Sequence, residues 1–272
     1  MSMPPPVSIC LPSFNNEAFI GSTIKTVLTQ SFTDFELVVV DDKSSDRTVE
    51  VVRSVQDPRI RLMENERNLG LEGNWTRALS CSRGKYVKLL CGDDLLYPGC
   101  LAQQVAALER HSKTGAVLAL CNREVINSEG RVVFRRKQKF AQGVVAGREL
   151  IRKSVRWGSN LIGEPAVGLF VRDAFAPSAF TANPYLADLA LWAEVLKHGN
   201  AFVTHRCLAA FRISQGQASA RIGHRQAASF RTFVRQIRRE RFYRVNALDS
   251  ILGSMLALPW CVLRNGFMRF AC

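Results

Sequence analysis

Two apolar runs that each end in a pair of aspartates decide the fold: Leu37-Val38-Val39-Val40-Asp41-Asp42 and Tyr86-Val87-Lys88-Leu89-Leu90-Cys91-Gly92-Asp93-Asp94. Such runs are typical of buried parallel strands, and ligands of open α/β sheets collect at the carboxyl ends of these strands. We therefore expect both pairs to line one crevice. Grouped carboxylates repel one another, and a cation, hydrogen-bond donors or solvent exposure must offset that cost. A divalent metal shared with a diphosphate is the sharpest explanation, whereas a single Asp after a strand often only caps a helix or starts a turn.

Strand and helix patterns alternate outward from these runs. Apolar residues recur at helical spacing after a first strand at 7–11, after the strand ending at Val40, and before the strand ending at Leu90. Further on, helices are expected at 101–110, 148–156 and 188–197, and strands at 116–121, 167–171, 202–203 and 208–213. This pattern predicts the α/β class, with a single Rossmann-like, mostly parallel sheet flanked by helices.

Composition narrows the classes of protein. The 272 residues carry a formal net charge of +14, but the surplus is local: 221–244 holds eight arginines against one glutamate. No RNA-binding or zinc-finger pattern accompanies them, so we expect no nucleic-acid partner. The eight cysteines form no C-x-x-C pair, which favours a reduced, cytoplasmic setting without a zinc site. Residues 1–6 show neither a basic nor an apolar leader, so no signal peptide or N-terminal anchor is expected.

Five segments in order resemble glycosyltransferase family 2, the inverting group with the A-type nucleotide-sugar-binding fold. They are 7–15, 40–46, 65–70, the Gly92-Asp93-Asp94 turn, and 188–192, and the resemblance extends to about residue 213. It implies a nucleoside diphosphate sugar as the donor and Mg²⁺ or Mn²⁺ as the cofactor. A hard cation of this kind suits carboxylate oxygens and grips the phosphates.

The resemblance also implies roles for the residues of the donor site. Asp94, with Asp93 beside it, would hold the metal, and Asp93 would also reach the ribose or the sugar. Asp42 corresponds to the carboxylate that contacts the base. The residues expected around the base, ribose and nucleotide are Pro12, Phe14, Asn15, Glu17, Arg67 and Asn68. Phe14 could instead be a core aromatic, and Arg67 could belong to a solvated salt bridge.

Inversion at the anomeric carbon needs a base that takes the proton of the acceptor hydroxyl. The resemblance assigns this role to Asp188, at the start of a helix that bears Trp192; the alternative is that Asp188 only caps that helix. Glu164 would contact the donor or acceptor sugar, or serve only in a turn. Arg212 lies where relatives carry an Arg followed by a His near the diphosphate, and here Ser214 stands at the expected His position.

The sequence divides into a catalytic domain at 1–220 and a helical tail at 221–272. Phe230, Phe233, Val234 and Ile237 follow helical spacing among arginines, which predicts a basic amphipathic helix. The apolar run at 248–263 is shorter than the about 20 residues that span a bilayer. We expect 221–263 either to contact a membrane surface or to pack on the catalytic domain or in a dimer, and the oligomeric state is open.

Together these features predict a metal-dependent inverting glycosyltransferase that moves a sugar to a hydroxyl of a glycan or lipid-linked acceptor. Polysaccharide or glycolipid assembly at the inner face of the cytoplasmic membrane is the expected setting. Two alternatives stay open. A nucleotidyltransferase on a similar sheet would want a Gly-rich, basic loop near the N-terminus, which 12–17 is not. The other is a nucleotide-binding module without turnover, which Ser214 keeps open.

Overall fold

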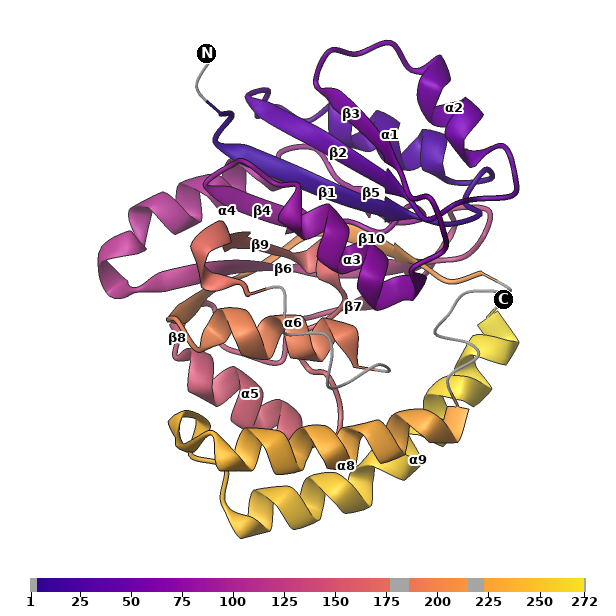
Figure 1. The fold of residues 1–272 in the computed structure, drawn as a ribbon. Helices are drawn as coiled ribbons and strands as arrows, with labels where there is room; N and C mark the ends of the chain where they lie inside the picture. The colour runs from indigo at the N-terminus through magenta and orange to yellow at the C-terminus, as the bar shows by residue number, and fades with distance from the viewer. Residues whose placement is uncertain (1–3, 177–185, 215–222, 272) are drawn as a thin grey trace.

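One large sheet forms the centre of the protein in the computed structural model, which describes residues 4–176, 186–214 and 223–271 (Figure 1). Its strands follow the order β3-β2-β1-β4-β9-β6-β10-β5, with β7 added to β6 and β8 added to β10. The strands are β1 Val7–Ser13, β2 Phe35–Asp41, β3 Ile60–Glu64, β4 Tyr86–Leu89, β5 Leu95–Leu96, β6 Ala116–Ile126, β7 Val132–Arg136, β8 Gly143–Val145, β9 Gly168–Val171 and β10 Asn200–Arg212.

Helices connect and cover these strands. The α-helices are α1 Ile20–Leu28, α2 Thr48–Ser54, α3 Gly70–Ser80, α4 Cys100–Arg110, α5 Gly147–Arg156, α6 Ala187–Leu196, α8 Gly223–Arg239 and α9 Ala247–Ala271. Single 3₁₀ turns lie at η1 Ser112–Thr114, η2 Pro165–Val167, η3 Arg172–Ala174 and η5 Arg241–Tyr243. The predicted α/β architecture with flanking helices is therefore confirmed.

The strands of the sheet do not all run in the same direction. β1 pairs in parallel with β2 and β4, and β2 pairs in parallel with β3, as the alternating pattern predicts. Beyond β4 the sheet is mixed, because β9 runs antiparallel to both β4 and β6 while β10 runs parallel to β6. The predicted fold class is therefore confirmed: β6 and β10 run in the same direction as β1 to β4, and β9 is an antiparallel strand between β4 and β6. The two closing strands predicted at 202–203 and 208–213 are one strand, β10, with register shifts between Val203 and Ala209.

The register between β1 and β2 places Asp41 and Asp42 at the carboxyl ends of these strands. In the parallel pairing of β1 with β2, Ser13 stands opposite Asp41, and the N–H of Asp42 donates to the carbonyl of Ser13 at 2.8 Å. On the other side of β1, the N–H of Leu90 donates to the carbonyl of Cys10 at 2.9 Å. The carboxyl ends of β2 and β4 therefore flank the end of β1, as the sequence predicts for one crevice.

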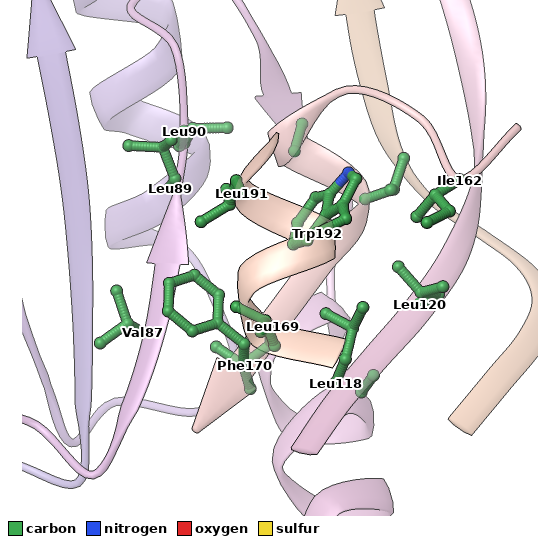
Figure 2. Close-up of a cluster of buried hydrophobic side chains, with 14 of the residues drawn as sticks. Val87, Leu89, Leu90, Leu118, Leu120, Ile162, Leu169, Phe170, Leu191 and Trp192 are labelled. Atoms are coloured by element: carbon green, nitrogen blue, oxygen red, sulfur yellow. The ribbon is translucent and has the colours of Figure 1, made fainter. Parts of the chain in front are cut away.

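Trp192 fastens α6 to the second half of the sheet. Its ring is fully buried among residues of β4, β6 and β9, and it meets Phe170 edge to face with ring centroids 6.5 Å apart (Figure 2). The indole N–H donates to the carbonyl of Gly163 at 2.7 Å. A Cβ at Gly168 would lie 2.4 Å from this ring, so glycine is required there by close approach. The packing fixes the helix that carries Asp188.

The C-terminal helices pack against the catalytic region. Figure 1 shows α8 and α9 side by side next to α5. The apolar face of α8 that the sequence predicted, namely Phe230, Phe233, Val234 and Ile237, is buried in the same core as the sheet. Among the described residues, no helix combines the length and apolar character needed to cross a bilayer. The domain boundary at residue 220 falls in 215–222, outside the described residues, and stays a prediction.

Candidate active site

Two loops at the ends of β1 and β2 are joined by reciprocal hydrogen bonds. Asn15 has a left-handed backbone, with φ 51°, and two hydrogen bonds hold it. Its N–H donates to Ser44 Oγ at 2.9 Å, and its Oδ1 accepts the N–H of Ser45 at 2.9 Å. Likewise the N–H of Glu17 donates to Asp46, and Glu17 Oε2 accepts the N–H of Arg47, both at 3.0 Å. Asn15 and Glu17 therefore brace the loops that frame the predicted nucleotide site.

Phe14 and Pro12 differ sharply in exposure. Phe14 is 47% exposed, so the alternative that it is a core aromatic is wrong. An exposed ring at the end of a strand is well placed to stack on a flat base. Pro12 is buried inside β1, opposite Val40. Its side chain consequently packs within the sheet, and contact of Pro12 with the base stays a prediction.

Asp42 is a buried anchor for the loop that precedes α3. Its carboxylate accepts from Asn65 Nδ2 at 2.7 Å and from the N–H groups of Leu69 and Gly70 at 2.8 and 2.9 Å, and the residue is only 2% exposed. Asn68 adds a bond to the carbonyl of Asp42 at 3.1 Å. The geometry assigns Asp42 and Asn68 a loop-holding role that the sequence did not reveal, and base contact by Asp42 stays a prediction.

Asn74 is a structural residue that sequence reasoning missed. Its Nδ2 donates to the carbonyls of Ser13 and Val40 at 3.2 and 3.1 Å, and its Oδ1 accepts from Asn65 at 3.1 Å. It thus ties the ends of β1 and β2 to α3. The available signal was an amide one helical turn before Ala78, at a position on the apolar side of the expected helix.

Asp94 is the most unusual carboxylate of the site. It is fully buried, its Oδ1 accepts the backbone N–H of Arg212 at 3.0 Å, and its Oδ2 is buried without a hydrogen-bond partner. Burial, followed by the negative charge of Asp93, raises the pKa of Asp94 well above its usual range. An ionised carboxylate with an orphaned oxygen needs a compensating cation, so this environment fits a hard divalent metal.

A metal at Asp94 would need ligands from outside the protein. Within the described residues, no three His, Cys, Asp or Glu side chains come close enough to hold an ion by themselves. Asp93 and Asp94 supply carboxylate oxygens, and phosphate oxygens and water are the usual further ligands of Mg²⁺. The donor set therefore suits an ion that binds together with a phosphate-bearing ligand.

Four carboxylates from three separate segments converge around Cys91. Burial raises the pKa of the Cys91 thiol, and the charges of Asp94, Asp93, Asp188 and Glu164 raise it further, in that order. The sequence predicted the convergence of Asp93 and Asp94 with the predicted base Asp188 from the resemblance alone. The structure brings these groups into one electrostatic neighbourhood, together with Glu164.

Asp188 lies in the first turn of α6. Leu186 occupies the cap position, and among the described residues its side chain makes no capping bond, so base and helix-end roles for Asp188 both stay predictions. Asp188 Oδ2 accepts from Asn160 Nδ2 at 2.8 Å, and Oδ1 accepts the N–H of Leu189 at 2.8 Å. Asn160 also donates to the carbonyl of Gly163 at 3.0 Å. Both carboxylate oxygens are therefore held in place by hydrogen bonds from the protein.

Glu164 belongs to a buried ion pair. It contacts the Nε of Arg123, which is 2% exposed, and lies 4.0 Å from Arg136. Burial acts to raise the pKa of Glu164, but the charges of Arg123 and Arg136 outweigh it, so the pKa is lowered. Sequence reasoning missed Arg123, although the polar triplet Asn122-Arg123-Glu124 inside an apolar strand was a signal for it.

Arg212 and Arg67 differ from one another in their surroundings. The Arg212 side chain is buried and donates to the carbonyls of Asp93 at 2.9 Å, Asn127 at 2.9 Å and Ser128 at 3.2 Å. These contacts hold Arg212 against the Gly92-Asp93-Asp94 turn, and its contact with the donor stays a prediction. Arg67 is exposed, and no ion pair among the described residues includes it.

The sheet presents two loops joined by hydrogen bonds, an acidic turn with an unsatisfied carboxylate oxygen, and an oriented carboxylate on a neighbouring helix. This is the architecture of an A-type, nucleotide-sugar-binding glycosyltransferase. The comparison with family models agrees, since the model described as "Glycosyl transferase family 2" matches residues 8–175. The chain belongs to this family.

Individual relatives and structures are similar to different extents. The Mycobacterium tuberculosis protein MT1568, which is uncharacterized, is 33% identical over 74% of this chain and 65% of its own length. The Escherichia coli enzyme WfgD, "UDP-Glc:alpha-D-GlcNAc-diphosphoundecaprenol beta-1,3-glucosyltransferase", is 35% identical over 46% of this chain and 49% of its own length. The chain thus spans less than two thirds of the length of these relatives. The mannosyltransferase PcManGT from Pyrobaculum calidifontis, solved with GDP-Man and Mn²⁺, superposes with a TM-score of 0.63 over 99% of this chain and 75% of its own, at 19% identity.

Proposed function

We propose that this chain is a metal-dependent inverting glycosyltransferase that transfers a sugar from a nucleoside diphosphate sugar to a hydroxyl acceptor. The observation that carries the proposal is the buried Asp94 Oδ2 without a hydrogen-bond partner, beside Asp93, together with Asp188 held on α6 by Asn160. Carboxylates so arranged suit a metal-bound leaving group on one side and a base on the other.

The donor would lie across the clasped loops and the acidic turn. Phe14 offers an exposed ring to the base, Asn15 and Glu17 brace the loop that carries it, and exposed Arg67 offers positive charge near the nucleotide. Asp94, with Asp93, would hold Mg²⁺ or Mn²⁺. When bound, the ion neutralises charge that develops on the departing diphosphate. The relative WfgD by its name uses UDP-Glc, and PcManGT was solved with GDP-Man, which supports a nucleotide-sugar donor.

Asp188 acts as the base in this proposal. The proton of the acceptor hydroxyl passes to a carboxylate oxygen of Asp188 while the acceptor oxygen forms a bond to the anomeric carbon. The bond from that carbon to the diphosphate breaks on the opposite face, and its electrons leave with the diphosphate. Asn160 and the N–H of Leu189 hold the carboxylate during this step. Glu164, fixed by Arg123, is placed to contact a sugar hydroxyl.

Sugar transfer is tested first with donors alone. UDP, dTDP and GDP are compared for thermal stabilisation with and without Mn²⁺, and the matching sugar donors are tested for slow hydrolysis. We expect strong, metal-dependent stabilisation by one diphosphate and hydrolysis of its sugar form. Stabilisation without any turnover would indicate the nucleotide-binding module, and release of pyrophosphate from a nucleoside triphosphate would indicate the nucleotidyltransferase.

We also propose a lipid-linked acceptor and a position at the inner face of the cytoplasmic membrane, in polysaccharide or glycolipid assembly. The name of WfgD specifies an acceptor on diphosphoundecaprenol, which supports the lipid. One side of α9 supports the membrane contact, because it exposes apolar residues at helical spacing: Leu248, Ile251, Met255, Leu258 and Val262, each between 43% and 69% exposed. We call these five residues the α9 stripe.

The charge around the α9 stripe favours anionic lipid over a second copy of the chain. Exposed arginines follow on the adjacent α8 and after it, at positions 231, 235, 238, 239, 241 and 244, while the nearby Asp249 is buried and paired with Arg152 at 2.7 Å. Anionic headgroups would attract these arginines by about 1 kcal/mol each, whereas a second copy of the chain would carry the same positive charges.

Vesicle binding tests the membrane contact. The protein should sediment with phosphatidylglycerol vesicles and not with phosphatidylcholine vesicles, and Met255→Asp should abolish sedimentation. Val144→Asp, on β8 with 40% exposure, is the matched control that should leave it intact. A dimer in solution that Met255→Asp dissociates, without vesicle binding by the parental protein, would overturn the proposal.

A further inference from the structure

A cavity of about 420 Å³ lies beside the acidic site, on the part of the sheet formed by β6, β7 and β10. Its lining is rich in cationic and hydrogen-bonding side chains: Tyr97, Asn122, Arg123, Glu124, Arg135, Arg136, Lys137, His205 and Cys207. None of these residues belongs to the loops that frame the predicted nucleotide site. The volume falls within the range of small-ligand pockets.

The cavity carries an excess of positive charge. Four cationic side chains line it, whereas the carboxylates in contact with them are those of Glu124 and Glu164. Arg135 donates to Glu124 at 2.8 Å, and Glu124 also accepts from the hydroxyl of Tyr97. Lys137 is exposed, and no ion pair among the described residues contains it. Guanidinium and ammonium groups around a pocket of this size suit a phosphate group.

The cavity is coupled to the reaction site through Glu164. Arg123 forms part of the cavity wall and contacts Glu164, and Arg136 approaches Glu164 to 4.0 Å from the same side. Glu164 in turn shares the electrostatic neighbourhood of Asp94 and Asp188. Glu164 also follows Gly163, whose carbonyl accepts from Asn160, and Asn160 donates to Asp188, so the cavity wall is linked to the predicted base through bonded neighbours.

We propose that this cavity binds a phosphate or diphosphate group carried by the acceptor, while the hydroxyl of the same acceptor is presented to Asp188. The inference rests on the proposed function and specifies the acceptor as a phosphate ester. The donor diphosphate would be held through a metal at Asp93 and Asp94, so a separate, cationic site on other strands suits a second phosphate-bearing molecule. Arg135, Arg136 and Lys137 select that acceptor against an uncharged glycoside.

The first experiment measures phosphate binding directly. Inorganic pyrophosphate is titrated into the full chain by calorimetry in EDTA, which removes metal-dependent binding at Asp94. The parental protein should bind it, and Lys137→Ala should weaken binding about fivefold to tenfold, because one charge-assisted contact is lost. Lys139→Ala is the matched control, since Lys139 is exposed on the same segment but lies outside the cavity lining. Equal binding by both variants would overturn the proposal.

The second experiment separates an acceptor phosphate from free phosphate. Transfer is compared between one sugar presented as an alkyl diphosphate ester and as an alkyl glycoside. Lys137→Ala should raise KM for the diphosphate ester about fivefold and leave KM for the glycoside and the rate of donor hydrolysis unchanged. If pyrophosphate binds but Lys137→Ala affects both acceptors equally, the cavity takes free phosphate and the proposal is wrong. If the parental protein does not hydrolyse any sugar donor, the proposed function itself is contradicted instead.

Discussion

Asp94 and Arg212, 118 residues apart in sequence, are joined by a hydrogen bond of 3.0 Å from the backbone N–H of Arg212 to Asp94 Oδ1. The other oxygen of this carboxylate, Oδ2, is buried without a hydrogen-bond partner. The two oxygens therefore have separate tasks: one fixes the acidic turn against β10, and the other is available to a cation.

Replacing Asp94 by Asn separates these tasks. The amide oxygen can still accept from Arg212, and the buried charge is removed, so the melting temperature without ligand should equal or exceed the parental value. The Mn²⁺-dependent part of the stabilisation by the preferred nucleoside diphosphate should disappear. Asp173→Asn, at a side chain 85% exposed, is the control and should keep the full effect of Mn²⁺. Retention of that effect by Asp94→Asn would contradict the metal assignment.

Asp188→Asn should bind the donor normally and lose transfer. General-base catalysis contributes about 100-fold or more, so kcat should fall at least that far while KM for the donor stays unchanged. Glu194→Gln makes the same chemical change on the same helix, where Glu194 pairs with Lys197 at 2.8 Å, and should keep kcat. The measurement is initial-rate kinetics of sugar transfer. A parental kcat in Asp188→Asn means that another group is the base.

Phe14→Ala should weaken nucleotide binding without affecting the fold. Stacking on an aromatic ring contributes about 0.5–1.5 kcal/mol, so Kd should rise up to about tenfold, and Phe14→Trp should restore it. The free energy of unfolding should change little because the ring is 47% exposed. Trp157→Ala, with a ring of similar exposure at 52%, is the control for Kd by calorimetry. An unchanged Kd in Phe14→Ala would exclude stacking on the base.

Asp42→Ala should destabilise the protein. The substitution leaves three donors around residues 65–70 without their acceptor, which we expect to lower the free energy of unfolding by roughly 2–4 kcal/mol. Asp34→Ala, at an exposed position before β2, should change it by less than about 0.5 kcal/mol. Urea denaturation measures both. A neutral effect at position 42 would show that the loop does not depend on this carboxylate.

Glu36 should make the free energy of unfolding depend on pH in the acidic range. This carboxylate is 3% exposed; burial acts to raise its pKa, but hydrogen bonds from Arg83, Ser8 and Arg61 prevail and lower it. A lowered pKa in the folded state means that Glu36 stabilises the protein above its unfolded pKa and that this stabilisation is lost as the pH falls through the folded value. Glu36→Gln should therefore cost about 2 kcal/mol at pH 7 and progressively less below about pH 4. A constant difference between the two proteins across this range would contradict the prediction.

The sequence predicts the N-terminal half of the fold well because its signals are local. The valine run before Asp41 and the apolar run before Asp93 depend on burial alone, and the structure confirms both strands and their shared edge. Strand direction in the other half is decided by long-range pairing. Nothing within Gly168–Val171 tells whether the strand will run with or against β4, so the mixed sheet was beyond a local pattern.

The residues of the candidate site were also predictable only where their signals are local. Residue types revealed Asp94 and Asp188 as candidates, but the partners that define what a side chain does lie far away in sequence. Arg212 looked available for a ligand, yet it clamps the acidic turn through contacts with carbonyls 84 and 119 residues away. Arg123 escaped notice because a charge within a strand gains its meaning only from Glu164 on another segment.

The carbonyl of Gly163 receives both the indole N–H of Trp192 and the amide of Asn160, and that amide also holds Asp188. Asp188, the proposed proton acceptor, and the start of the turn at Glu164 are consequently held in one frame by the packing of the Trp192 ring against the sheet. Chemistry on this frame would be set in place by folding itself, so evolution could exchange donor or acceptor preferences in the surrounding loops without rebuilding the reactive geometry.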